Sequence, residues 1–111
     1  MSFPTSLFGD DLGDEKWHGG ALAHDGCIYA APCNSRRILK IDPKKRTAEL
    51  VDPILPDGGE KYCGAVAAKN KCVYFIPDKA EQVLKFDVQT QEGRFVGNKY
   101  DTDNASKQTK I

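Results

Sequence analysis

Short stretches in which hydrophobic and polar residues alternate run along most of the chain. In the first half they predict four β-strands, at residues 18–23, 27–31, 37–41 and 47–51. Turn-forming pairs such as Asp25-Gly26 and Asp42-Pro43 separate these stretches. No stretch repeats its hydrophobic residues at the spacing of a helix, so the pattern predicts an all-β fold.

The same pattern returns 45 residues later, because residues 16–52 align with residues 61–97 without a gap. Similar side chains also occupy many of the positions that differ. This agreement indicates a tandem duplication, and a period near 45 residues is typical of repeat architectures. The identical aligned pairs are Lys16/Lys61, Gly19/Gly64, Ala23/Ala68, Cys27/Cys72, Tyr29/Tyr74, Pro32/Pro77, Leu39/Leu84, Lys40/Lys85, Asp42/Asp87 and Val51/Val96.

Two segments of the first unit carry a family resemblance: Gly-Cys-Ile-Tyr at residues 26–29 and Leu-Lys-Ile-Asp-Pro at residues 39–43. They resemble the cores of kelch-type and NHL-type β-propeller repeats, and the resemblance extends over both units. It departs from the kelch pattern where that pattern has a glycine pair after the second strand, because Pro32 and Pro77 stand there. The resemblance implies two four-stranded antiparallel propeller-type blades.

Two blades are too few for a closed propeller, which needs about four to eight. The expected fold is therefore an incomplete propeller, or part of one that association completes. Association could join copies into a ring or dock the pair into a larger complex, and a third interpretation is that the chain is a fragment.

The predicted organisation has four parts. Residues 1–15 form an N-terminal extension, in which residues 6–9 resemble the last strand of each unit and are interpreted as a stray strand. Residues 16–60 hold the first blade and a linker rich in proline and glycine, and residues 61–97 hold the second blade. Residues 98–111 form a polar tail that we expect to fray.

Composition narrows the class of protein. The chain of 111 residues is 40% hydrophobic and 29% charged, which is ordinary for a globular domain with one modest core. It contains no apolar run long enough for a membrane-spanning helix and no signal-peptide pattern near Met1, so we expect an intracellular, cytoplasmic protein without membrane insertion. The four cysteines are expected to be reduced, and Cys27 and Cys72 occupy matching positions of the two units.

The charges balance, with 16 basic and 16 acidic residues, which argues against a nucleic-acid partner. Basic residues nevertheless crowd residues 36–46 of the first unit, and the second unit lacks most of them. A solvated edge or contact with an acidic protein accounts for such a cluster. The scaffold itself does not require it.

In a four-stranded meander, the loop before the first strand and the loop between the second and third strands lie at the same end. Both units should therefore contribute to one candidate surface for a protein partner, a second copy or a ligand. Aromatic and arginine side chains together are typical of binding hot spots. The candidate residues are Trp17, His18, Cys33, Asn34, Arg36, Arg37, Tyr62, Cys63, Asp78 and Glu81. The competing interpretation is that Trp17 and Tyr62 are equivalent core residues between blades.

Four of these residues, His18, Cys33, Cys63 and Asp78, are of types that bind zinc. No close-spaced pair of ligands pre-forms half a site, so we expect no metal site and no cofactor. Neither histidine has a positioned nucleophile beside it, and Asp42 and Asp87 are expected to stabilise turns. These observations favour a protein without catalytic activity.

The sequence therefore favours a non-catalytic protein-interaction module or scaffold subunit. The alternative is a lectin-like propeller in which Trp17 and Tyr62 stack on a small ligand or a carbohydrate. An enzyme fragment is the third hypothesis.

Overall fold

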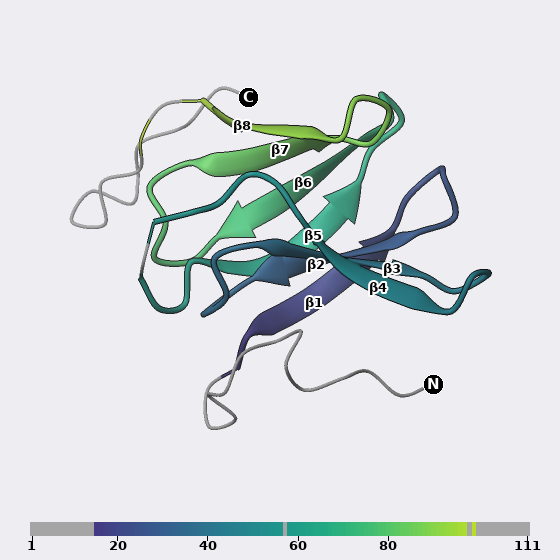
Figure 1. Cartoon of the computed structure of the whole chain (residues 1–111). Helices are drawn as coiled ribbons and strands as arrows, with labels where there is room; N and C mark the ends of the chain where they lie inside the picture. The colour runs from purple at the N-terminus through teal and green to yellow at the C-terminus, as the bar shows by residue number, and fades with distance from the viewer. Residues whose placement is uncertain (1–14, 57, 98, 100–111) are drawn as a thin grey trace.

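The computed structural model describes residues 15–56, 58–97 and 99. Over these residues the chain forms two four-stranded antiparallel sheets and no helix (Figure 1). Each sheet pairs its strands in the order of the sequence, and neither sheet closes on itself. The predicted all-β class is confirmed. Sheet 1 contains β1 (Trp17–Leu22), β2 (Ile28–Pro32), β3 (Ile38–Asp42) and β4 (Thr47–Val51), and sheet 2 contains β5 (Tyr62–Ala67), β6 (Cys72–Pro77), β7 (Val83–Asp87) and β8 (Glu92–Val96).

The four strands predicted for the first half are all present, with bounds that differ by at most one residue. The strands of sheet 2 follow at the same spacing, except that β6 begins one residue early. Turn chemistry accounts for the sharp ends of the strands. The Asp42 carboxylate accepts hydrogen bonds from the backbone N–H groups of Lys44 and Lys45, and Asp87 accepts the equivalent pair from Gln89 and Thr90.

The core lies between the sheets. Because side chains alternate between the two faces of a strand, each sheet has one face that we call its front and another that we call its back. The front of sheet 1 packs against the back of sheet 2, and at the centre the rings of Tyr29 and Phe86 lie with centroids 5.1 Å apart. The contacting side chains include Ala21, Tyr29, Ala31, Ile38 and Val51 from sheet 1 and Ala65, Val73, Phe75, Leu84 and Phe86 from sheet 2.

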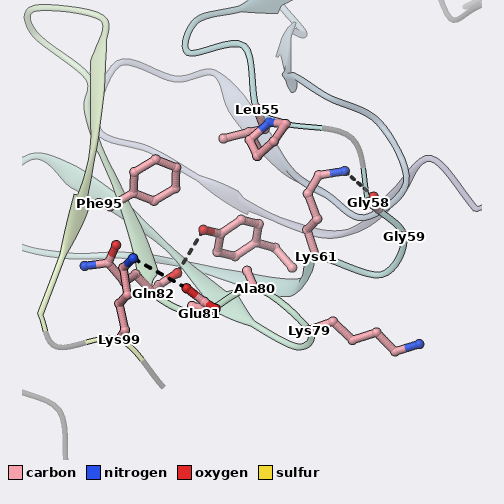
Figure 2. Close-up of a pocket in the computed structure, with 12 residues that line it drawn as sticks. Leu55, Gly58, Gly59, Lys61, Lys79, Ala80, Glu81, Gln82, Phe95 and Lys99 are labelled. Carbon is pink, nitrogen blue, oxygen red and sulfur yellow. Dashed lines mark hydrogen bonds and ion pairs between the residues drawn. The ribbon is translucent and has the colours of Figure 1, made fainter. Parts of the chain in front are cut away.

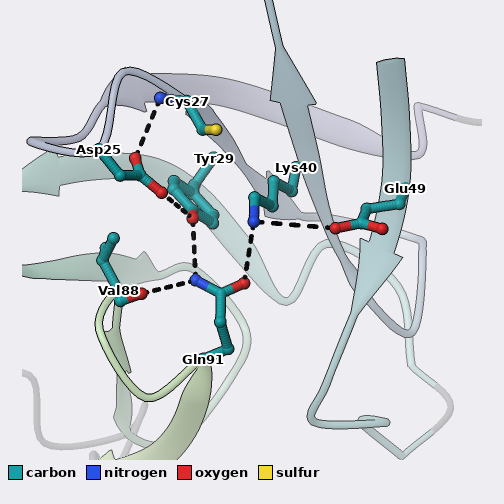
Figure 3. A network of polar contacts seen from close by, with 7 residues as sticks. All are labelled: Asp25, Cys27, Tyr29, Lys40, Glu49, Val88 and Gln91. Atoms are coloured by element: carbon teal, nitrogen blue, oxygen red, sulfur yellow. Dashed lines mark hydrogen bonds and ion pairs between the residues drawn. The ribbon is translucent and has the colours of Figure 1, made fainter. Parts of the chain in front are cut away.

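A polar network ties the same two faces together at their edge (Figure 3). Gln91, in the turn between β7 and β8, donates a hydrogen bond to the Tyr29 hydroxyl at 3.1 Å and accepts one from Lys40 at 3.2 Å. Tyr29 in turn donates to Asp25 at 2.7 Å, and Lys40 lies 3.8 Å from the Glu49 carboxylate. Burial is the main cause that raises the pKa of Tyr29, so its hydroxyl stays protonated and can donate.

The segment between β4 and β5 is a third component of the packing. Leu55 is 1% exposed, and its backbone N–H donates to the Arg36 carbonyl at 2.7 Å while the Arg36 side chain donates back to the Leu55 carbonyl. Pro53 lies against Gly93 of β8, where a Cβ atom would come within 2.7 Å of the Pro53 Cδ. The linker is therefore packed on sheet 2 and hydrogen-bonded to sheet 1.

The first strands of the two sheets approach each other closely. A Cβ atom on Gly19 of β1 would lie 3.5 Å from the Gly64 Cα of β5. Gly19 also has a φ of 73°, a conformation that favours glycine. The positive φ therefore explains glycine at position 19, and the strands β1 and β5 lie within van der Waals contact of each other.

The interpretation of residues 6–9 as a stray strand and the expected fraying of residues 98–111 fall outside the described residues, apart from Lys99. Over the part of the chain that is described, no helix has the length and apolar character needed to cross a membrane.

Candidate functional site

The loops that were predicted to share one end of the molecule do lie together. In sheet 1, the backbone N–H groups of Cys33 and Ser35 both donate to the Lys16 carbonyl, at 2.9 and 3.1 Å. In sheet 2, Asp78 and Ala80 donate in the same way to Lys61. We call this surface the loop end, and it comprises residues 15–18, 33–37, 60–63 and 78–82.

Asn34 connects the two halves of the loop end. Its side-chain oxygen accepts a hydrogen bond from the Glu60 N–H at 3.1 Å, and its side-chain nitrogen donates to the Glu15 carbonyl at 2.6 Å. The Lys61 N–H also donates to the Cys33 carbonyl at 3.0 Å. Asn34, one of the predicted site residues, therefore helps to join the two sheets.

Trp17 and Tyr62 make equivalent contacts. The Trp17 indole N–H donates to the Arg37 carbonyl at 2.9 Å, and the Tyr62 hydroxyl donates to the Gln82 carbonyl at 2.8 Å. Tyr62 is only 1% exposed, and burial raises its pKa to about 12. Both rings anchor the start of a first strand to the loop before a third strand. These contacts favour the interpretation of the two rings as structural equivalents.

The two arginines of the predicted site contact the linker. Arg36 bonds to Leu55, and the Arg37 guanidinium lies 3.0 Å from the Asp52 carboxylate. Lys40 lies in β3 and contacts Gln91, whereas Lys44, Lys45 and Arg46 are exposed in the turn between β3 and β4, at the opposite end of the sheet from the loop end. The structure thus divides the basic cluster of the sequence into two separate groups.

The four possible zinc ligands differ in their surroundings. Cys33 is buried, and desolvation, followed by the negative charge of Glu15, raises the pKa of its thiol. His18 is exposed and contacts Glu15 at 2.6 Å, while Cys63 and Asp78 are exposed on sheet 2. Among the described residues, no three histidine, cysteine or acidic side chains are grouped so that they could hold a metal ion. All four cysteines are free thiols.

A pocket of about 560 Å³ opens at the loop end, between the linker and sheet 2 (Figure 2). Leu55, Tyr62 and Phe95 supply its apolar surface. Of the predicted site residues, Tyr62 and Glu81 line this pocket. Leu55 and Phe95 were not predicted from the sequence. The linker around Leu55 shows no regular spacing of hydrophobic residues, and Phe95 looks like any other residue of an alternating strand.

The lysines at the pocket rim form hydrogen bonds or ion pairs with nearby oxygen atoms. Lys61 donates to the Gly58 carbonyl at 2.6 Å, and Lys99 lies 3.8 Å from the Glu81 carboxylate. Lys79 and Glu60 form an exposed pair at 2.9 Å, which lowers the pKa of Glu60 and raises that of Lys79. The pocket therefore suits an apolar side chain better than an anion.

Two sheet faces outside the core also carry exposed apolar side chains. On the front of sheet 2, Val66 is 55% exposed and Ile76 is 41% exposed, and on the back of sheet 1, Leu22 is 65% exposed. The sequence contained a signal for these faces, because both alternating sets of positions in several strands are apolar. Strands that are buried on both faces read as near-continuous hydrophobic runs.

Comparisons with protein-family models, with curated proteins and with solved structures found no match for this chain.

Proposed function

We propose that the chain is a non-catalytic protein-interaction module, and that it binds through the two sheet faces that its own core leaves open. The exposure of Leu22, Val66 and Ile76 carries this proposal. Contiguous exposed apolar patches mark interaction sites, whereas single exposed apolar side chains are ordinary. Val66 and Ile76 lie on one face of the neighbouring strands β5 and β6, so they form such a patch together. The edge strands, β1 and β4 in sheet 1 and β5 and β8 in sheet 2, each have one side that no described strand pairs. Such edges are an aggregation hazard unless something covers them.

The propeller interpretation supports the same function. Two four-stranded meanders stacked front to back, with their first strands in contact, have the arrangement expected of neighbouring blades. A pair of blades would need further sheets on both sides. The proposed module is thus an incomplete propeller that association completes.

The contacts of the aromatic rings give less support to a carbohydrate-binding function. A ligand that stacks on Tyr62 needs access to the ring, yet the residue is 1% exposed and its hydroxyl is bonded to Gln82. The observations on the loop end therefore favour protein binding over stacking on a ligand.

Site-specific photo-crosslinking in cells that produce the chain tests this function. A crosslinker at Ile76, on the front of sheet 2, is expected to give a discrete protein adduct, whereas one at Gln89, in an exposed turn, is not. The adduct should disappear when Val66→Glu places a charge on the same face. A crosslinker at Ile76 that yields no protein adduct contradicts the proposal.

A further inference from the structure

We infer that the partner is a second copy of this chain, and that the front of sheet 2 in one copy packs on the back of sheet 1 in the other. This inference rests on the proposed function and names the partner. The proposed contact repeats, between molecules, the contact that joins the two sheets within one molecule.

The front of sheet 2 carries apolar side chains where the front of sheet 1 carries its core residues. Tyr74, which is half-buried, stands at the position of Tyr29, and Val83, which is already only 6% exposed, at that of Ile38. The exposed residues Val66 and Ile76 stand where Ala21 and Ala31 pack in the core, so this face offers larger side chains than its equivalent. The aligned pairs on the two fronts are Ala21/Val66, Tyr29/Tyr74, Ala31/Ile76, Ile38/Val83 and Val51/Val96.

The back of sheet 1 matches the back of sheet 2 in the same way. Ile41 stands at the position of Phe86, so Tyr74 of one copy would meet Ile41 of the other as Tyr29 meets Phe86 within the chain. Leu22 lies beside this contact, because its aligned residue Ala67 stays exposed within the chain, and Ala30 and Leu39 are already buried. The contact therefore centres on Ile41, which is half-buried. Apolar side chains therefore occupy both members of the proposed interface. The aligned pairs on the two backs are Leu22/Ala67, Ile28/Val73, Ala30/Phe75, Leu39/Leu84, Ile41/Phe86 and Leu50/Phe95.

The polar edge of the proposed contact differs from that of the core in charge. Within the chain, Gln91 reaches Lys40, whereas the equivalent residue of a second copy is Arg46, which would reach Lys85. Glu92 lies on the same face as Lys85 and lines a cleft of about 240 Å³ together with Asp87, Thr90 and Arg94. Arg94 stands where Glu49 pairs with Lys40, so Arg46 would face the cations Lys85 and Arg94 as well as the carboxylates of Asp87 and Glu92. Apolar packing, rather than this edge, therefore supplies the proposed contact.

The contact joins two different faces, so it is heterologous. Copies can add one after another through such a contact until the assembly closes into a ring. Two copies joined by two such contacts place four sheets around one axis. This number is the smallest of the range of about four to eight blades that closed propellers use.

Light scattering on the purified chain, together with two face variants, tests the inference. The unaltered chain is expected to form a discrete oligomer. Ile76→Glu, which blocks the front of sheet 2, and Ile41→Glu, which blocks the back of sheet 1, should each be monomeric alone. Mixed together, they should form a dimer, because each supplies the face that the other lacks. Ile54→Glu makes the same chemical change at a 59% exposed linker residue and should leave the oligomer intact.

Three results would overturn the inference: a monomeric unaltered chain, a mixture of the two variants that stays monomeric, or an oligomer that survives Ile41→Glu. Circular dichroism checks that each variant is folded, since Ile76 is 41% exposed and Ile41 is half-buried. If the chain is monomeric while the crosslinker at Ile76 still captures a different protein, the inference fails and the proposed function stands. If neither association occurs, both fail.

Discussion

Aligned residues of the two sheets make the same contacts wherever their side chains can do so. Trp17 and Tyr62 differ in ring and in donor atom, yet each donates to the carbonyl of the residue that lies 20 positions later. Asp25 and Asn70 likewise each accept a hydrogen bond from the backbone N–H two residues on. Aligned positions of the two repeats can therefore keep one structural role even where the residue changes. A difference between the repeats does not by itself indicate a functional role.

Alkaline pH is expected to destabilise the fold through buried thiol and phenol groups. Burial raises the folded-state pKa of Cys27 and Cys33 above the ordinary thiol value of 9.0, and that of Tyr62 from 10.0 to about 12. The unfolded chain ionises these groups at a lower pH than the folded chain does. Their contribution to the free energy of unfolding is therefore fully present below the ordinary pKa values, and it is lost as the pH rises toward the folded-state pKa values. The urea midpoint, measured under reducing conditions, should fall steadily from pH 8 to pH 11.

Tyr62→Phe provides the control for this pH dependence. It removes the hydrogen bond to Gln82, so it should lower the free energy of unfolding at pH 8 by about 1 kcal/mol. It also removes one ionisable group, so the additional loss of stability above pH 10 should be smaller than in the unaltered chain. A urea midpoint that stays constant from pH 8 to pH 11 would show that these groups ionise equally in the folded and unfolded chains.

The contact of the linker with β8 predicts a large effect of a single methyl group. In Gly93→Ala the new Cβ would lie 2.7 Å from Pro53 Cδ and 3.6 Å from Leu84, so linker and strand must move apart. We expect a loss of about 1–3 kcal/mol in the free energy of unfolding, as for other overpacked sites. Chemical denaturation measures this loss.

Gly64→Ala is the matched control, because its Cβ would meet only Ile76 Cγ1, at 4.0 Å, and its φ is not positive. Its effect should be clearly smaller than that of Gly93→Ala. Equal effects of the two substitutions would mean that strand propensity, rather than the contact with Pro53, determines the result.

The strands could be predicted from the sequence because their signals are local. Alternation at residues 37–41 and the Asp42 turn are both readable within a few residues, and the structure places β3 and its turn there. The loop end followed from topology alone, once four consecutive strands were expected. Leu55 could not be predicted, since its burial depends on a hydrogen bond to Arg36 and on packing between two sheets. The pocket beside it was missed for the same reason.

At the scale of the whole molecule, the two sheets share one core and should unfold together. Trp17 is the only tryptophan of the chain and lies in sheet 1, so its fluorescence reports on that sheet. Phe86→Ala removes a fully buried ring from sheet 2 that contacts Tyr29, and it should cost about 3–5 kcal/mol. The Trp17 transition should therefore shift to lower denaturant, although the substitution lies in the other sheet.

Far-UV circular dichroism, which follows both sheets, should give the same midpoint as Trp17 fluorescence in the unaltered chain and in Phe86→Ala. Separate midpoints for the two signals would mean that the sheets unfold independently. In that case the front-to-back contact would contribute little to stability, and its repetition between copies would lose its energetic basis.

The neighbour-to-neighbour order of the strands has a kinetic consequence. Each strand pairs only with the strand before or after it in the sequence, so every sheet can assemble from hairpins that close short loops. Folding rates fall as the average sequence separation of contacting residues increases. Here the distant contacts are those between the sheets, such as the one between Tyr29 and Gln91. Formation of the hairpins should thus be fast for an all-β chain, and the docking of one finished sheet on the other should limit the rate of folding.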